Sequence, residues 1–445
     1  MAALNTAIIE NAISRHTDGA SLVVGYSGGL DSAVLLHLCC RYAQENPAVN
    51  VRAIHINHQL SSCSDQWQLH CEQTARALGI EIDSVNVSVV KGKRGVEAAA
   101  RDARYKAFQH MVNDGELLLL AHHQNDQAET LLLRLMRGSG PLGLRGMEET
   151  SQRQNLLIHR PLLSVTRDAL EMHAKSVGLS WIDDHSNEDL RFDRNFLRHD
   201  IVPQLQARWP GAINNMARAA RLCGESVELL EALAKQDCDM LTNQQLCLKI
   251  EPALALSRAR LNNVLRYLIQ AHKLLLPSEV VLGQIIDEVM MAGEGAQPLV
   301  RWRGAEVRRH RGYLYFLSSL PQFEPADVPP ITNFDAEVNL GNSVGKLIFE
   351  EGSGTAISQA ALQGKPLKVR YRQAKLRCVP AGRPSNLLTH WFQQYRLEPW
   401  LRDRQPLLYC GNQLVAAPGL FVSEGYQYCA SKGQPLWVDW VQPVQ

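Results

Sequence analysis

The 445-residue sequence lacks the features that mark several large classes of protein. None of its 10 cysteines lies in a CxxC pair, so the sequence does not support a zinc ribbon or a cluster-binding loop. The longest apolar stretches, such as Leu117 to Ala121, are far below the ~20 residues that a membrane helix needs. The first residues include an acidic side chain and no unbroken apolar run, which is not typical of a signal peptide. We therefore expect a cytoplasmic protein with free thiols and no membrane partner.

An excess of charge of one sign is also missing. The chain has 46 Lys and Arg against 45 Asp and Glu, so any surface for nucleic acid must be local. With 45% apolar and 20% charged residues, the composition excludes collagen-like, coiled-coil and disordered classes for the whole chain. At ~100–200 residues per domain, this length is enough for several domains.

Residues 1–215 alternate short apolar runs with amphipathic segments, which is typical of an α/β domain with a doubly wound parallel sheet. The expected strands are 21–26, 51–56, 80–89 and 116–121. The expected helices are 32–42, 64–78, 96–111 and 126–136. Repeated strand–helix units of this length predict a sheet that is covered by helices on both faces.

The remaining chain has a different pattern. Residues 216–320 are expected to form a mostly helical domain that ends in a hairpin near 300–317. Residues 321–335 are proline-rich at their start and predict a linker. Residues 336–445 predict a small mixed α+β domain, with short strands around one helix near Leu387 to Tyr395.

A glycine-rich string lies between the first strand and the first helix. The two glycines permit backbone angles that a Cβ would forbid, so consecutive N–H groups can converge on an anion. The following helix adds its positive N-terminal end, and two serine hydroxyls can donate to phosphate oxygens. The candidate nucleotide-binding residues are Ser27, Gly28, Gly29, Leu30, Asp31 and Ser32.

This string, SGGLDS, resembles the signature of the PP-loop ATP pyrophosphatase superfamily. The resemblance implies an adenine nucleotide alpha hydrolase-like fold and cleavage of ATP between its α- and β-phosphates, with AMP transferred to a substrate oxygen. It also implies that Asp31 is catalytic and helps to place Mg²⁺. The loop alone does not distinguish among the members of the superfamily.

Further short sequence motifs distinguish among the members of this superfamily. Each alone has an ordinary interpretation, such as a solvated basic face, a charged helix start or a turn. Their types and order resemble those of the tRNA(Ile)-lysidine synthetases: EAAARDARY at 97–105, AHHQNDQAET at 121–130, RPLL at 160–163, DDHSN at 183–187 and DRNFLR at 193–198. Gln59, Asn125 and the stretch 383–390 depart from the family pattern.

This resemblance implies a reaction in which lysine is joined, at the expense of ATP, to C2 of the wobble cytidine of a CAU-anticodon tRNA(Ile), through an adenylated cytidine. The product decodes isoleucine rather than methionine codons. The implied partners are L-lysine and tRNA, with no obligate protein partner.

Residue roles follow from the same strings. Asp126 and Glu129 share one helical face at the end of a buried strand, and we assign them to lysine binding, with Asp126 and His122 also catalytic. Four arginines are assigned to tRNA binding: Arg101, Arg104, Arg194 and Arg198.

The tail adds a local basic surface. Residues 365–404 contain ten Lys and Arg against two acidic residues, with aromatic residues among them. We assign tRNA binding to Lys368, Arg370 and Arg402. Two other functions stay open from the sequence: another PP-loop enzyme, such as a tRNA thiolase with a separate sulfur carrier, and a catalytically silent tRNA-binding protein.

Overall fold

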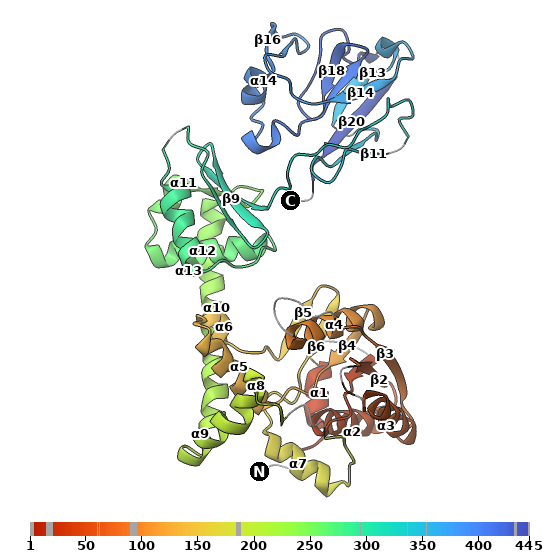
Figure 1. Ribbon diagram of the computed structural model, residues 1–445, viewed down its shortest axis with the longest axis vertical. Helices are drawn as coiled ribbons and strands as arrows, with labels where there is room; N and C mark the ends of the chain where they lie inside the picture. Colours follow the sequence, from red (N-terminus) through yellow and green to blue (C-terminus); the bar gives the residue numbers. More distant parts are fainter. Residues whose placement is uncertain are drawn as a thin grey trace. The chain divides into compact units, whose positions relative to one another are not determined.

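A computed structural model describes residues 4–14, 21–59, 61, 63–89, 96–183, 188–293, 295–335, 337–352, 354–430 and 434–443 (Figure 1). The chain divides into two compact units, Met1–Leu229 and Leu230–Gln445. The division falls within helix α10 (Ala212–Leu241).

Unit 1 contains the expected doubly wound sheet, with strand order β3-β2-β1-β4-β6-β5. All neighbouring strands are parallel except β5, which pairs antiparallel with β6. The strands are β1 (Ser21–Gly25), β2 (Asn50–Asn57), β3 (Glu81–Asn86), β4 (Glu116–Leu119), β5 (Thr150–Arg153) and β6 (Leu156–His159). The fold class predicted for this part of the chain is therefore confirmed.

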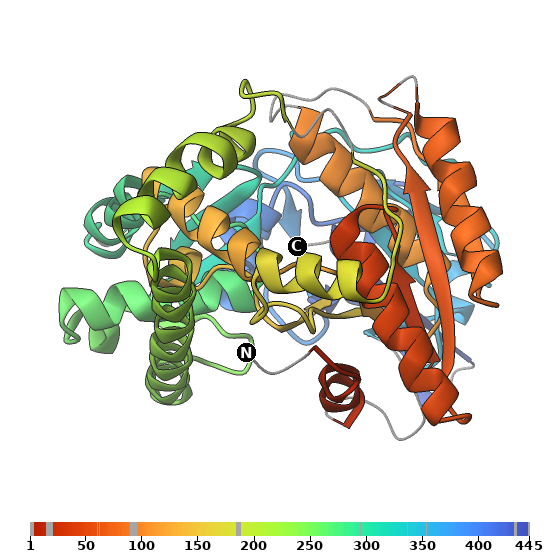
Figure 2. The same ribbon diagram turned by 90° about the horizontal axis from the view of Figure 1, so that it is seen from below.

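Helices cover both faces of this sheet because alternate strand residues point to opposite sides. Leu22 and Val24 of β1 pack with α2 and α7, whereas Val23 packs with Phe108 of α4. Figure 2 shows these helices from a second direction. The helices of unit 1 that precede α10 are α1 (Ala7–Ser14), α2 (Leu30–Glu45), α3 (Ser64–Ala77), α4 (Val96–Met111), α5 (Gln124–Met136), α6 (Pro141–Leu144), α7 (Arg167–Ser176), α8 (Asp193–Phe196) and α9 (Val202–Arg208), with a π-helix at Leu197–Ile201.

The strand order places the loops after β1 and β4 next to each other. From β1 the sheet continues to β2 on one side and to β4 on the other, so the connections diverge between β1 and β4. Open α/β sheets bind ligands at the carboxyl ends of strands at such a point. The loop that follows β1 and the helix start that follows β4 therefore lie next to each other at this edge of the sheet, which we call the crevice.

Unit 2 begins with a helical part and a four-stranded sheet of order β7-β10-β9-β8. This sheet contains the predicted hairpin as β8 (Leu299–Trp302), β9 (Ala305–His310) and β10 (Tyr313–Ser318), joined by β7 (Leu248–Lys249). The helices are α11 (Ile250–Leu254), α12 (Arg258–Ala271) and α13 (Glu279–Gln284), continued by a π-helix at Ile285–Met290.

The C-terminal part of unit 2 is built from antiparallel sheets around helix α14 (Leu388–Gln394). One sheet has the order β11-β12-β20-β13, another β14-β17-β18-β19, and a third pairs β15 with β16. Their strands are β11 (Val338–Asn339), β12 (Lys346–Ile348), β13 (Thr355–Ser358), β14 (Leu367–Arg370), β15 (Arg377–Cys378), β16 (Asn386–Leu387), β17 (Leu407–Cys410), β18 (Gln413–Ala417), β19 (Phe421–Val422) and β20 (Pro435–Val441). Short 3₁₀ turns lie at Ala360–Leu362 and Pro399–Leu401.

The proline-rich stretch after β10 is hydrogen-bonded to this C-terminal part. Arg404 donates from Nη2 to the Pro321 carbonyl at 2.7 Å, and Ala326 N donates to the Leu340 carbonyl at 2.9 Å. Ile331 forms a bridge with Leu367. Residues 321–335 therefore lie along the C-terminal sheets.

Across the described part of the chain, no helix combines the length and apolar character needed to cross a membrane.

Candidate functional site

The phosphate loop is held by its own two serines. Ser27 N donates to Ser32 Oγ at 3.2 Å, the two hydroxyl oxygens lie 3.1 Å apart, and Ser32 Oγ donates to the Gly29 carbonyl at 2.9 Å. Gly29 is the N-cap of α2 and has no side chain with which to cap the helix. The first-turn N–H groups of α2 therefore stay available for an anion in this loop.

Gly28 adopts a conformation that only glycine takes without strain, with φ at +84°. A Cβ on this residue would lie 2.8 Å from Cys71 Sγ and 2.9 Å from Ile182 Cδ1. Both the backbone angle and the close packing thus require glycine at this position. This agrees with the expectation that the loop uses its glycines to shape an anion cradle.

Asp31 lies at the start of α2 and faces an arginine and a histidine. Its Oδ1 accepts a hydrogen bond from Arg167 Nη1, and its Oδ2 lies 3.6 Å from His123 Nε2. Arg167 is the first residue of α7, and its backbone N–H donates to Asn125 Oδ1 at 3.1 Å. The Asn125 side chain, a departure from the family pattern, thus fixes the start of α7 beside the phosphate loop.

The start of α5 forms the other side of the crevice. His123 and Asp126 make a reciprocal capping box, in which each side chain accepts from the other residue's backbone N–H. Asp126 and Glu129 are 7% and 2% exposed. The shared helical face predicted for these two carboxylates therefore points into the protein.

Two arginines pair with both of these carboxylates. Arg194 donates to Glu129 Oε2 and to Asp126 Oδ1, each at 2.7 Å. Arg198 donates to Glu129 Oε1 at 2.7 Å and to Asp126 Oδ1 at 3.1 Å. Isolated charges would be costly at this depth, so the four side chains stabilise one another as a set. We call them the carboxylate–arginine cluster.

Burial and neighbouring cations keep two nearby histidines, His122 and His58, neutral. Burial is the main reason that the pKa of His122 falls to about 3, and the nearby charges of Arg160, Arg104 and Arg194 also lower it. The charge of Asp126 acts in the opposite direction. Burial and Arg104 likewise lower the pKa of His58 to about 4. His122 is therefore an uncharged imidazole at neutral pH, with a buried Nδ1 that has no hydrogen-bond partner among the described residues.

Arg101 and Arg104 of α4 lie near one buried ring. Their guanidinium carbons are 5.6 Å and 5.9 Å from the centre of Tyr105, and that of Arg153 is 4.4 Å away on the same ring. Arg104 Nε is buried, with no hydrogen-bond partner in the described part of the chain. Burial lowers the pKa of Arg104, and its nearby charges include those of Arg101, Arg194 and Asp126. The expected basic helix face thus lies beside the carboxylate–arginine cluster.

The assigned tail residues lie in unit 2. Lys368 is exposed on β14, and Arg370 on the same strand lies 4.7 Å from the centre of the Tyr409 ring. Arg402 Nε donates to the Leu397 carbonyl at 3.1 Å. Arg370 and Arg402 are thus held by aromatic or backbone contacts, in contrast to the arginines of the carboxylate–arginine cluster.

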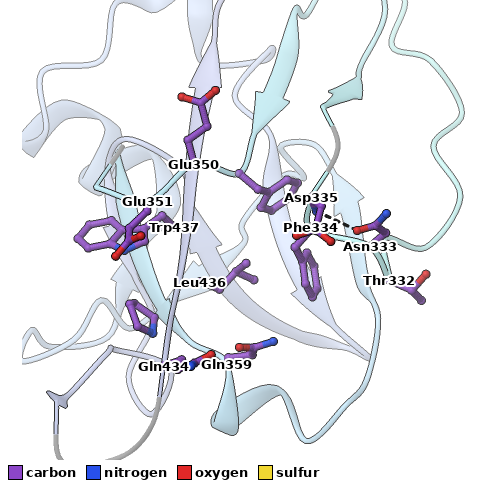
Figure 3. Close-up of a pocket in the computed structure, with 12 residues that line it drawn as sticks. Thr332, Asn333, Phe334, Asp335, Glu350, Glu351, Gln359, Gln434, Leu436 and Trp437 are labelled. Atoms are coloured by element: carbon purple, nitrogen blue, oxygen red, sulfur yellow. Dashed lines mark hydrogen bonds between the residues drawn. The ribbon is translucent and has the colours of Figure 1, made fainter.

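A separate pocket of about 620 Å³ lies in the C-terminal part of unit 2 (Figure 3). Aromatic walls are supplied by Phe334, Phe349 and Trp437, and Asp335, Glu350 and Glu351 also line it. Its lining includes none of the residues assigned to ATP, lysine or tRNA.

The donor set around the phosphate loop fits Mg²⁺ bound together with a nucleotide. Mg²⁺ in phosphate-transfer sites takes one or two protein carboxylates and completes its shell with phosphates and water. Asp31 is a partly exposed carboxylate at the loop. Among the described residues, no group of three or more His, Cys, Asp or Glu is placed to hold a metal without such a ligand.

The structure thus brings most residues predicted in the first 200 positions to one crevice, including Asp31, His122, Asp126 and Glu129. The predicted string at 183–187 continues past Asp183 into residues that lie outside the described ranges.

Sequence patterns did not indicate a role for Arg167 or His123. The capping threonine of α7 marks a helix start, but nothing local to Arg167 indicates that it reaches Asp31.

Three family models match separate parts of the chain. A PP-loop domain model matches residues 4–205, a TilS substrate binding domain model matches 248–315, and a TilS substrate C-terminal domain model matches 367–440. A solved U34-tRNA thiolase from Methanococcus maripaludis is 16% identical over 49% of this chain and 77% of its own, with a TM-score of 0.42.

Two curated relatives match along nearly their whole lengths. The tRNA(Ile)-lysidine synthase of Coxiella burnetii is 38% identical over 97% of this chain and 95% of its own. That of Yersinia pseudotuberculosis is 38% identical over 99% of this chain and 97% of its own. The strings around the crevice and these full-length matches lead to the same conclusion: the chain belongs to the tRNA(Ile)-lysidine synthase family.

Proposed function

We propose that this chain joins the side-chain amine of L-lysine to C2 of the wobble cytidine of CAU-anticodon tRNA(Ile), as a carbon–nitrogen ligase that converts ATP to AMP and pyrophosphate. Membership of the family supports an ATP-dependent, tRNA-modifying enzyme. The free thiols of cysteines such as Cys39, Cys71 and Cys410 suit the reducing cytoplasm.

One observation carries the proposal. The phosphate loop and the carboxylate–arginine cluster meet at the same strand ends, where His123 lies 3.6 Å from Asp31 and 3.4 Å from Asp126. A nucleotide on the loop and an amine near Asp126 would therefore be neighbours. This is the arrangement required by a reaction that first activates an oxygen with ATP and then replaces it with an amine.

The proposed reaction has two chemical steps. Cytidine O2 attacks the α-phosphorus, and the bond from that phosphorus to pyrophosphate breaks. The lysine amine then attacks C2, loses a proton, and the C2–O bond breaks to release AMP. Backbone N–H donors and nearby cations of the crevice stabilise the charge that develops on phosphate in the first step.

Lysine recognition is assigned to Asp126 and Glu129. Free lysine carries a charged ammonium at neutral pH, so its binding site needs an anion, and its reaction needs a proton acceptor. Both carboxylates are held in place by Arg194 and Arg198. An incoming ammonium would share this cluster, and its attraction to the carboxylates would compete with the two guanidinium groups.

His122 is assigned to the reacting oxygen or the phosphate. Because its pKa is lowered to about 3, it would act as a neutral hydrogen-bonding group rather than as a cation. Mg²⁺, held by Asp31 together with the phosphates, would neutralise charge on the nucleotide. Arg167 already pairs with Asp31, so this carboxylate is oriented towards the loop before any ligand binds.

The tRNA is assigned to cations in both units: Arg101, Arg104, Arg194 and Arg198 in the first, and Lys368, Arg370 and Arg402 in the second. We propose a catalytic domain at 1–215, a mostly helical substrate domain at 216–320, a connecting segment at 321–335 and a tRNA-binding domain at 336–445. A cytidine in a single-stranded anticodon loop can leave its stack more easily than one in a duplex.

The test is incubation with ATP, CAU-anticodon tRNA and labelled lysine, with release of AMP and pyrophosphate measured in parallel. We expect label in the tRNA and one AMP for each lysine incorporated. A matched reaction contains a sulfur donor in place of lysine. Sulfur in the tRNA, or neither product, would contradict the proposal.

A further inference from the structure

The phosphate loop is contacted from outside by the segment that follows α7. The backbone N–H of Ile182 donates to the Gly28 carbonyl at 2.9 Å. The Ile182 side chain occupies the space beside Gly28, because a Cβ on that glycine would lie 2.9 Å from Ile182 Cδ1. Ile182 lies 154 positions from Gly28 in the sequence, so this contact depends on the tertiary fold.

The hydrogen bond to Gly28 determines the direction of the next N–H group. In a trans peptide unit, the carbonyl of one residue and the N–H of the following residue point in opposite directions. The Gly28 carbonyl points to Ile182, so the N–H of Gly29 points away from it. That N–H donates a long 3.5 Å hydrogen bond to Ser27 Oγ, which leaves it available for a phosphate oxygen.

The segment that carries Ile182 is itself anchored. Leu170 and Ala174 of α7 are fully buried in the core beside α2. Arg167, at the start of α7, pairs with Asp31 at the far end of the same loop. Residues 167–182 thus contact the loop at both its glycine end and its aspartate end.

We propose that Ile182 is a positioning residue for ATP, whose backbone N–H fixes the Gly28–Gly29 peptide so that the Gly29 N–H faces the bound phosphates. The proposal rests on ATP binding by the loop. A glycine pair is free to rotate this peptide, and rotation would direct a carbonyl oxygen at the phosphates instead. The hydrogen bond from Ile182 stabilises the orientation that binds an anion.

The experiment removes this single N–H. Ile182 is replaced by its α-hydroxy acid through nonsense suppression, which changes the backbone amide to an ester at nearly constant shape. The matched control is the same replacement at Leu179, whose N–H donates to the Ala174 carbonyl at 2.9 Å within the same segment. Affinities for ATP, pyrophosphate and adenosine are measured by equilibrium dialysis.

We expect the ester at Ile182 to weaken ATP and pyrophosphate binding about five- to tenfold, the range of one hydrogen bond. Adenosine has no phosphates, so its affinity should not change. The Leu179 ester should bind all three ligands as the unmodified protein does. A folding defect would weaken adenosine binding as well. A loss of ATP affinity without a loss of adenosine affinity therefore reports on the phosphate loop alone.

Equal weakening of ATP and adenosine, or unchanged ATP affinity in the Ile182 ester, would overturn the positioning role. The unmodified protein supplies the separate test of the function on which the role rests. If it bound no ATP, the proposed function itself would fail, and this result differs from a selective failure of the ester.

Discussion

The crevice of unit 1 and the basic strands of unit 2 use positive charge in opposite ways. In the crevice, Arg194 and Arg198 are paired with carboxylates that are 7% and 2% exposed. In unit 2, Arg372 pairs with Asp403 where the two side chains are 36% and 67% exposed, and Lys368 is exposed on β14. Buried pairs determine geometry, whereas exposed cations attract a polyanion without fixing any one atom.

This difference separates the residues that act in the reaction from those that contribute to tRNA affinity. Removing one member of a buried set leaves its partners uncompensated, so the effect on that set is large. Removing one exposed cation leaves one phosphate without its counter-charge, so the effects are small, additive and dependent on salt. Four predictions test this contrast, from the largest expected effect to the smallest.

Asp31→Ala should give the largest reduction in activity. It removes the carboxylate that Arg167 and His123 face, and we expect pyrophosphate release to fall by about 10²–10³-fold, as when one charge-stabilising group is removed from an active site. The control is Asp168→Ala, which removes an exposed carboxylate from the first turn of α7. Normal turnover by folded Asp31→Ala protein would show that Asp31 has no role in the reaction.

Glu129→Gln keeps the shape of the side chain and removes its charge. We expect the lysine KM to rise about 10-fold or more, because a hydrogen-bonded charge contributes roughly 1.5–3 kcal/mol, while the ATP KM stays within about twofold. Glu171→Gln is the matched control, since Glu171 pairs with Lys175 on an exposed part of α7. An equal rise of both KM values would reassign Glu129 to the fold or to the nucleotide.

The buried histidines of unit 1 predict a decrease of stability in mild acid. Burial lowers the pKa of His122 to about 3 and that of His58 to about 4, below the ordinary 6.5 of the unfolded chain. Below pH 6.5 the unfolded chain therefore binds protons that the folded chain does not, and the free energy of unfolding falls as the pH decreases towards 4.

At pH 5 the buried His122 should cost about 2 kcal/mol relative to pH 7. His122→Gln should remove its share of this pH dependence, as measured by urea unfolding at the two pH values. The control His110→Gln alters an exposed histidine on α4. An identical pH dependence in the His122→Gln variant and the unmodified protein would contradict the burial of a neutral imidazole.

Lys368→Ala combined with Arg370→Ala should have the smallest effect per residue. We expect tRNA affinity to fall several-fold, and the plot of log affinity against log salt to become less steep by about 0.7–0.9 for each phosphate that the protein no longer neutralises. Lys346→Ala is the control, because Lys346 lies in a different sheet and pairs with Glu337. Unchanged affinity and slope in a filter-binding salt series would show that β14 does not bind tRNA.

Local sequence patterns were sufficient to predict strands β1 to β4, the phosphate loop and the placement of Asp126 at a strand end, but not strands β5 and β6. Each depends on neighbouring residues: apolar runs, a glycine pair and a charged helix start. The partners of these residues were not predictable in this way. Arg167 reaches Asp31 across 136 positions, and Arg194 reaches Glu129 across 65 positions. Such pairs depend on how α7 and α8 pack, which no local pattern records.

The partners of Arg194 and Arg198 were likewise not predictable from local sequence patterns. The place of these two arginines in a family string indicated a role in tRNA binding, and the fold places both against Asp126 and Glu129. A guanidinium has five N–H donors, so an arginine that pairs with a carboxylate can also face a phosphate. Their tRNA role therefore stays a prediction.

The most direct test of the contrast between the two units is ATP-dependent incorporation of labelled lysine into CAU-anticodon tRNA, measured at saturating and at limiting tRNA. Glu129→Gln is compared with the Lys368→Ala and Arg370→Ala double variant at a lysine concentration that is limiting for both. We predict that Glu129→Gln is slow at both tRNA concentrations, and that the double variant is slow only when tRNA is limiting. Recovery of Glu129→Gln at saturating tRNA, or a double variant that stays slow there, would contradict this division between chemistry and affinity.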